Sequence, residues 1–232
     1  MDMTFVAEMA WKSALIAGAA LGLAYALRSR APGDRALVLR IGVAMLLLMP
    51  FIAVWLPALE IAAFAAPEPA AGPAYVLPPE LMLAAASAAS APTLEPSVWD
   101  DPAPLVLLVY LGGLAMVGSR LLAGLFLLQR WTGRAEPVAC REWLAAFERV
   151  RWSLPDESEV RLLASGDVAS PLSWGWRRPV ILIDTETLGQ PEDAEAILAH
   201  EAAHIARRDW PALILSRLAA ALFWFNPLVW ML

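Results

Sequence analysis

Two histidines and a glutamate lie within five consecutive residues of the stretch ILAHEAAHIARRDW: His200, Glu201 and His204. The whole chain has two histidines, and both are in this stretch. Positions four apart share one face of an α-helix, so both rings can direct a nitrogen at one point. Glu201 lies about 100° around the helix from His200. It can therefore reach a water beside a metal ion, but it is poorly placed to bind that ion.

The chemistry of this H-E-x-x-H pattern is metal-assisted hydrolysis, with two zinc ligands and a general base. Bound zinc lowers the pKa of its water towards ~7. Glu201 would take the proton as the hydroxide attacks a peptide carbonyl, and would pass it to the leaving amine. The alternative is a polar helix face with two solvated histidines. The context favours the metal site, because the pattern lies on a predicted helix that follows a predicted strand.

The composition is that of a membrane protein. Of the 232 residues 59% are hydrophobic and 17% are charged, with a mean hydropathy of +0.58, against roughly 45–50% apolar residues in soluble domains. The formal net charge is −6, and basic patches with interleaved aromatic residues are absent, so direct nucleic-acid binding has no support. The single cysteine, Cys140, cannot form an internal disulfide and is expected to be a packed thiol.

Four apolar runs approach the ~20 residues that a helix needs to cross a bilayer, at 4–27, 36–58, 104–129 and 211–232. The first run is not a signal peptide, because no small-residue cleavage site follows it and its arginines come after it. The predicted organisation is two transmembrane helices in 1–59, an extracytoplasmic loop in 60–103, a third helix in 104–129, a cytoplasmic domain in 130–209 and a fourth helix in 210–232.

The arginines set the predicted orientation. Arg28, Arg30 and Arg35 follow the first span, and Arg130 and Arg134 follow the third. The loop between the second and third spans has no Lys or Arg, so the positive-inside rule places the N-terminus outside and the domain in the cytoplasm. That loop is rich in Ala and Pro, which is typical of a semi-flexible linker, with a short helix possible near 79–89.

Charged residues also occur inside the predicted spans. Glu8 and Lys12 form an i, i+4 pair near the outer end of the first span, expected to be an interfacial pair, with a sensing or helix-contact role as the alternative. Arg40, Arg120 and Arg217 fall in the inner halves of their spans. We expect their side chains to reach the cytoplasmic headgroups; the alternative is that they line a cavity under the domain.

The domain at 130–209 shows a mixed pattern. Helical spacing covers 138–151, and strand patterns cover 159–164 and 179–183, with a turn between them in SPLSWGWRR. A helix is predicted from Pro191 to about Arg208, with acidic residues in its first turn, and a break follows at 209–211.

Three blocks in this order, SPLSWGWRRPVILID, EAILAHEAAHIARRDW and LFWFNPLVW, resemble the membrane metallopeptidases of the BlaR/MecR antibiotic-sensor type. The resemblance implies an α-helical integral membrane protein of four spans, with a small α+β, zincin-like metallopeptidase domain in the cytoplasm between the third and fourth spans. It implies His200 and His204 as zinc ligands and Glu201 as the base. It also implies that the strand Pro179, Val180, Ile181, Leu182 and Ile183 is an active-site edge strand that aligns a peptide by strand addition.

The third zinc ligand of that family is a glutamate beyond the Asn-Pro block, and a catalytic zinc site needs three protein ligands. After Asp209 the sequence has no Asp, Glu, His or Cys. Asp209 itself is predicted to orient a ligand or to pair with an arginine, and Asn226 is a weaker candidate ligand. We expect a segment beyond Leu232, or another chain, to supply the third ligand. The family's extracellular penicillin-binding sensor is not within these residues.

The leading hypothesis is a membrane-embedded zinc endopeptidase with a cytoplasmic active site, in the bacterial cytoplasmic membrane. Its substrate would be a regulatory protein, itself, or both, and the resemblance suggests a transcriptional repressor. The alternative is a non-catalytic membrane sensor or scaffold with a structural or vestigial metal site. A transporter or channel is a weaker alternative, because intramembrane acids are few and no broken helix pair is evident.

Overall fold

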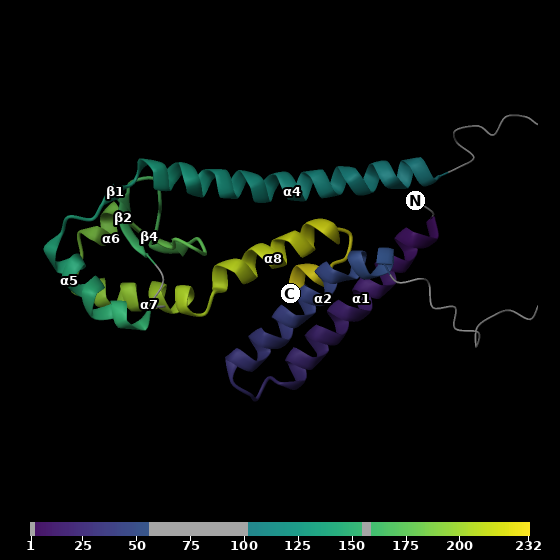
Figure 1. Cartoon of the computed structure of the whole chain (residues 1–232), viewed down its shortest axis with the longest axis horizontal. Coiled ribbons are helices and arrows are strands. Elements are labelled where there is room, and N and C mark those ends of the chain that lie inside the picture. The colour runs from purple at the N-terminus through teal and green to yellow at the C-terminus, as the bar shows by residue number, and fades with distance from the viewer. Residues whose placement is uncertain (1–2, 56–101, 155–158) are drawn as a thin grey trace, which may run out of the picture.

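The computed structural model describes residues 3–55, 102–154 and 159–232, which are mostly helical with a small sheet. Among these residues, three helices are long and apolar enough to cross a membrane: α1 (Met3–Ala26), α2 (Pro32–Trp55) and α4 (Ala103–Arg134). They agree with the first three predicted spans. The beginnings of α1 and α4 lie at one end of the molecule, and the sheet lies at the other (Figure 1).

The helices α1 and α2 form a hairpin that packs against α8 (Asp209–Leu222) and the short helix η4 (Val229–Met231). Their shared core contains Ala17, Leu46, Ala219 and Phe223. The predicted pair of Glu8 and Lys12 is confirmed, with 2.6 Å between Lys12 Nζ and a Glu8 carboxylate oxygen.

The helix α4 continues past the predicted end at residue 129 to Arg134. Its 32 residues extend about 48 Å at 1.5 Å per residue, more than the ~30 Å of a hydrocarbon core. None of its residues is buried against the described part of the chain. Its C-terminal turns reach the sheet. There Trp131 packs against a hydrophobic cluster that consists of Leu163, Val168, Val180 and Leu182.

The sheet consists, within the described residues, of β1 (Glu136–Pro137), β2 (Arg161–Ser165), β3 (Leu172–Trp174) and β4 (Val180–Asp184), in the order β1-β2-β4-β3. The strands β2 and β4 are parallel, and β3 pairs antiparallel with β4. The prediction that 179–183 is an edge strand is therefore wrong. Every residue of β4 is buried, as expected of a central strand that is covered on both faces, and β3 occupies the edge.

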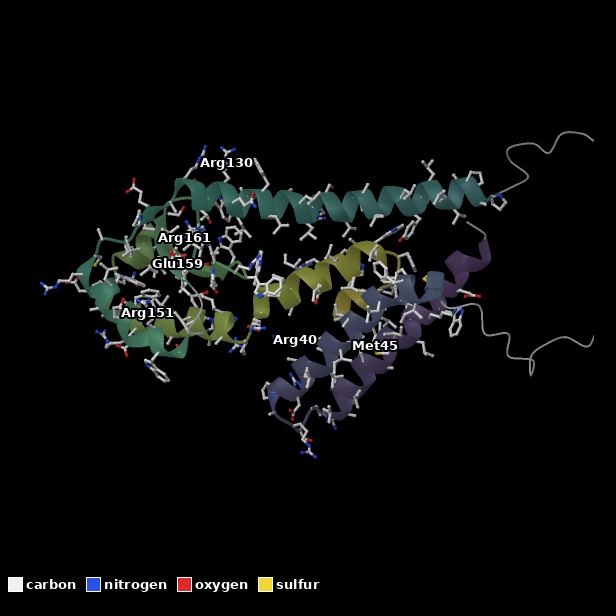
Figure 2. All side chains as sticks on the ribbon, in the orientation of Figure 1. Arg40, Met45, Arg130, Arg151, Glu159 and Arg161 are labelled. Atoms are coloured by element: carbon white, nitrogen blue, oxygen red, sulfur yellow. The ribbon has the colours of Figure 1, made fainter. Side chains whose placement is uncertain are left out.

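Alternate residues of β4 enter two cores. Ile181 and Ile183 pack with α5 (Arg141–Val150) and α7 (Ala194–Ala206), whereas Val180 and Leu182 pack towards the end of α4. The remaining short helices are η2 (Arg151–Ser153), α6 (Thr185–Leu188) and η3 (Pro191–Asp193). The sheet thus lies between α5 and α7 on one face and the end of α4 on the other. Figure 2 shows Arg130, Arg151, Glu159 and Arg161 at this end of the molecule.

The fourth predicted span is not one continuous helix. The helix α8 has 14 residues, or about 21 Å, and ends at Leu222. A turn follows, in which the Asn226 side chain accepts a bond from the Leu228 amide and donates to Ser13 Oγ, both at 3.0 Å. Proline at 227 disfavours a helical Asn226. The loop predicted at 60–103, including the helix near 79–89, lies outside the described residues up to residue 101.

Candidate metal site

The helix α7 presents its two histidines on the face away from its core. Ala194, Leu198 and Ala202, each four residues from the next, are buried against α5 and the sheet. His200 is exposed and His204 is half-buried. The apolar stripe fixes the rotation of α7, so that both imidazoles emerge on the same side.

The two imidazoles converge. The distance between His200 Nε2 and His204 Nε2 is 3.2 Å, and the ring centroids are 4.8 Å apart. Two nitrogens bound to one tetrahedral zinc at 2.0–2.1 Å would be roughly 3.3–3.4 Å apart. Nitrogens this close either share a proton or face a common cation, and the observed separation fits two ligands of one zinc ion.

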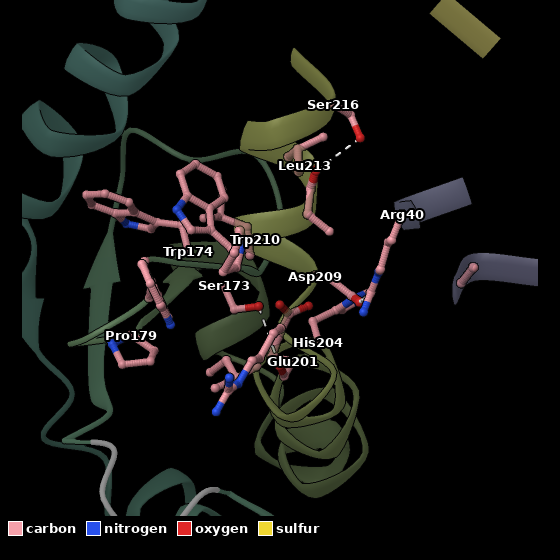
Figure 3. Close-up of a pocket in the computed structure, with 18 of the residues that line it drawn as sticks. Arg40, Ser173, Trp174, Pro179, Glu201, His204, Asp209, Trp210, Leu213 and Ser216 are labelled. Atoms are coloured by element: carbon pink, nitrogen blue, oxygen red, sulfur yellow. Dashed lines mark hydrogen bonds and ion pairs between the residues drawn. The ribbon is translucent and has the colours of Figure 1, made fainter. Parts of the chain in front are cut away.

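Glu201 is 7% exposed and lines a cavity of about 970 Å³ together with His204 and β3 (Figure 3). A smaller hollow of about 470 Å³ lies beside it and is lined by His200 and, again, by Glu201. The helix and the edge strand are joined by Ser173, whose hydroxyl donates to the Glu201 carbonyl at 3.4 Å. Glu201 thus lines both hollows, the larger one together with His204 and the edge strand and the smaller one together with His200.

Asp209 holds His204 from the other side. Its Oδ2 lies 2.7 Å from His204 Nδ1 and 3.0 Å from Arg207 Nη2. Burial raises the pKa of Asp209, but hydrogen bonds from His204 and Arg207 and the charge of Arg207 outweigh burial and hold the pKa below its usual value. An ionised Asp209 favours the tautomer in which His204 Nδ1–H donates a hydrogen bond to the carboxylate, and in that tautomer Nε2 carries the lone pair that a metal would bind.

The Asp209 carboxylate also contacts the hairpin of α1 and α2. Arg40 of α2 donates to Asp209 Oδ1 at 2.7 Å and to the Arg207 carbonyl at 3.1 Å, and it lines the larger cavity. Reaching the cytoplasmic headgroups was the expected role of Arg40, and lining a cavity was the alternative. The structure supports the alternative for this arginine.

Among the described residues, no group of three His, Cys, Asp or Glu side chains is arranged to hold a metal. Asn226, the weaker candidate for a third ligand, is buried and already bonded to Ser13 and Leu228. The described residues thus bring together two imidazole nitrogens that could hold a metal, beside Glu201.

Sequence reasoning named His200, Glu201, His204 and Asp209, and the structure brings these four together. It placed the candidate substrate strand at 179–183, but that strand is interior. Two contacts were missed: Ser173 of the edge strand and the partnership of Arg40 with Asp209. The only signal for Arg40 was its charge within an apolar run.

Helices able to cross a membrane, and a small sheet against a helix that carries H-E-x-x-H, define the class of candidate membrane metallopeptidases. A family model described as BlaR1 peptidase M56 matches residues 5–232, and the chain belongs to this family of metallopeptidase type. The chain is 29% identical over 93 residues to the regulatory protein BlaR1 of Bacillus licheniformis, a match that covers 40% of this chain and 16% of that protein. The matched part is thus a small share of the relative's length.

Proposed function

We propose that this chain is a membrane-embedded, zinc-dependent endopeptidase with a cytoplasmic active site, which cleaves a regulatory protein, itself, or both in signalling. The observation that carries the proposal is the convergence of two imidazole nitrogens at 3.2 Å beside the buried Glu201 and a large cavity. Membership of a peptidase family supports the same activity.

Each residue of the site has a separate role in the proposed hydrolysis. His200 and His204 would hold the zinc ion through Nε2, and Asp209 would keep the His204 ring in the required tautomer. Zinc, when bound, supplies the Lewis acidity that activates water and polarises a peptide carbonyl. Glu201 takes the proton of the attacking water and gives it to the leaving amine. A third ligand from outside the described residues would complete the site.

The peptide would be aligned by β3 rather than by β4. Within the described part of the chain, β3 pairs with β4 on one side, and its residues Leu172, Ser173 and Trp174 line the cavity next to Glu201. An extended peptide can add to such an edge through backbone hydrogen bonds. The substrate backbone would then pass directly over the candidate metal site.

We place the protein in the bacterial cytoplasmic membrane, and the arrangement of the helices supports a site on the cytoplasmic side. The α1–α2 connection, which carries Arg28 and Arg30, and the sheet both lie away from the end where α1 and α4 begin (Figure 1). These arginines favour the cytoplasmic side.

The test uses detergent-purified full chain. About one zinc per chain is expected by elemental analysis, the single-site value for this motif, with loss of zinc in His204→Ala. Glu201→Gln should keep the zinc and abolish cleavage, both of the chain itself and of a proteome-derived peptide library read by mass spectrometry. Normal cleavage by Glu201→Gln would refute the mechanism.

The second candidate is a non-catalytic sensor or scaffold, favoured by the finding that no group of three His, Cys, Asp or Glu side chains among the described residues is arranged to hold a metal. It predicts that cells with Glu201→Gln respond to the inducing signal as the wild type does, even though the metal is bound.

A further inference from the structure

The feature that carries a further inference is the link between α2 and the candidate metal site. Arg40 and Asp209 are 169 positions apart in the sequence, and their side chains meet at 2.7 Å. Figure 3 shows Arg40 reaching from α2 towards Asp209, next to His204. We propose that Arg40 is a positioning residue, which fixes the carboxylate of Asp209 and through it the ring of His204. A change in the position of α2 in the membrane would then change the geometry of the metal site. The inference deepens the proposed function and rests on it for its zinc-bound form.

The contact of Arg40 is two-pronged. One guanidinium nitrogen, Nη2, bonds Asp209 Oδ1, and the other, Nη1, bonds the carbonyl of Arg207 at 3.1 Å. Arg207 is the C-terminal cap of α7, where helix carbonyls lack partners within the helix. The planar fork of arginine suits two such acceptors at once, which the ammonium of lysine cannot match.

The backbone between the two acceptors has an unusual conformation. Arg208, between α7 and α8, has φ 54° and ψ 43°, in the left-handed region that residues other than glycine rarely occupy. Arg208 separates α7 from α8 (Figure 1), and the two acceptors of Arg40 belong to the residues on either side of it. Arg40 therefore clamps the junction that carries Asp209.

The Asp209 carboxylate connects Arg40 to His204. Its Oδ1 meets Arg40, and its Oδ2 meets His204 Nδ1 at 2.7 Å and Arg207 Nη2 at 3.0 Å. Arg207 belongs to the same turn as Asp209, so its contact cannot couple Asp209 to the position of the membrane helices. Arg40 comes from a candidate span. Loss of Arg40 frees Oδ1 and lets the carboxylate rotate towards Arg207, away from the position that orients the imidazole.

The chain provides a matched control on the same helix. Arg35 of α2 is exposed, and no partner is seen for it within the described residues. Arg35→Met removes the same charge from the same span as Arg40→Met, but not the contact with Asp209. Arg40→Lys keeps the charge and loses the fork.

The first readout is metal binding by full chain in detergent, with Co²⁺ alone as the probe, followed by its visible absorption and by competition with Zn²⁺. Arg40→Met should weaken Co²⁺ binding roughly tenfold, the lower end of the effect of losing outer partners of metal ligands, and should alter the Co²⁺ spectrum. Arg35→Met should bind as the wild type does, and Arg40→Lys should be intermediate. In an Asp209→Asn background, Arg40→Met should add little.

The second readout needs no metal. The chain has two histidines, so the imidazole ¹⁵N spectrum of histidine-labelled, chelator-treated protein contains two ring systems, and His204→Ala assigns them. At pH 8 the wild type should hold His204 with the proton on Nδ1, and Arg40→Met should lower that population, whereas Arg35→Met should not.

The outcomes separate the two proposals. A wild-type chain without Co²⁺ or Zn²⁺ affinity would refute the zinc site, and the tautomer of His204 would still decide the role of Arg40. If Arg40→Met and Arg35→Met give the same His204 spectrum, the positioning role is refuted, even when the zinc site and the Glu201→Gln result stand.

Discussion

Gly113 of α4 offers a sharp test of how the long helix is attached to the rest of the molecule. A methyl group built at Gly113 would overlap the indole of Trp224, whereas one at the neighbouring Gly112 would meet nothing within 4 Å. Two hydrogen bonds flank this contact: Trp224 Nε1 donates to the Tyr110 carbonyl at 3.2 Å, and the Tyr110 hydroxyl donates to the Leu222 carbonyl at 3.1 Å. Gly113 is therefore the point where α4 meets the turn after α8.

The magnitude follows from these contacts. Overpacking costs about 1–3 kcal/mol, and a hydrogen bond lost with the displaced indole costs about 0.5–1.5 kcal/mol. Replacing Gly by Ala in a helix gains up to ~1 kcal/mol in propensity, but this gain is common to Gly112→Ala and Gly113→Ala. The difference between the two variants should thus be about 2–4 kcal/mol, with Gly113→Ala the less stable.

Unfolding by SDS titration in mixed micelles, followed by circular dichroism, measures this difference. Gly112→Ala serves as the control for the general effect of a methyl group on α4. Equal midpoints for the two variants would show that α4 does not rest on Trp224, and the packing reasoning would fail.

Two further predictions concern buried polar groups. Asp184 is 5% exposed and caps α6 by accepting the Thr187 amide at 2.9 Å; burial raises its pKa, but its backbone hydrogen bonds outweigh burial and lower the pKa. Its stabilisation is therefore complete above the unfolded pKa of ~3.9 and is lost as the pH falls through the folded pKa, so Asp184→Asn should remove that part of the acid sensitivity in unfolding titrations between about pH 5 and 2. Ser13→Ala leaves the buried Asn226 amide without its partner and should cost about 1–3 kcal/mol, measured by SDS titration, whereas Ser119→Ala, on the exposed face of α4, should cost less than about 0.5 kcal/mol.

The local elements of the domain were predictable because their patterns are local. The helix at 138–151 is found as α5, the strands at 159–164 and 179–183 as β2 and β4, and the helix after Pro191 as η3 and α7. The strands β1 and β3 have two and three residues, too few to show an alternation. Their pairing is a tertiary property, and so is the interior place of β4. An apolar β-branched run predicts a buried strand but not its neighbours.

The break between α7 and α8 was predicted at 209–211 and lies at Arg207 and Arg208 instead. Proline at 211 indicated a boundary, but proline is tolerated in the first turn of a helix, and Pro211 lies in the first turn of α8. The break between the two helices falls at Arg208, which is in the left-handed region. Propensity gives no reason to expect an arginine there, and the two contacts that Arg40 makes on either side of it come from another span.

The apolar segment from 211 to 232 shows why composition alone does not define a span. An apolar run of this length is compatible with crossing a bilayer, and equally with a shorter helix followed by a turn whose polar groups are satisfied by the protein. The turn at Asn226 has such partners, since its amide and carbonyl oxygen bond Ser13 and the Leu228 backbone. The packing of α8 on α2 and of Trp224 on α4 then ties both membrane elements to the segment directly after Asp209. We therefore expect a shift of α2 or of α4 to act on the junction between α7 and α8, as the proposed signal-controlled peptidase would require.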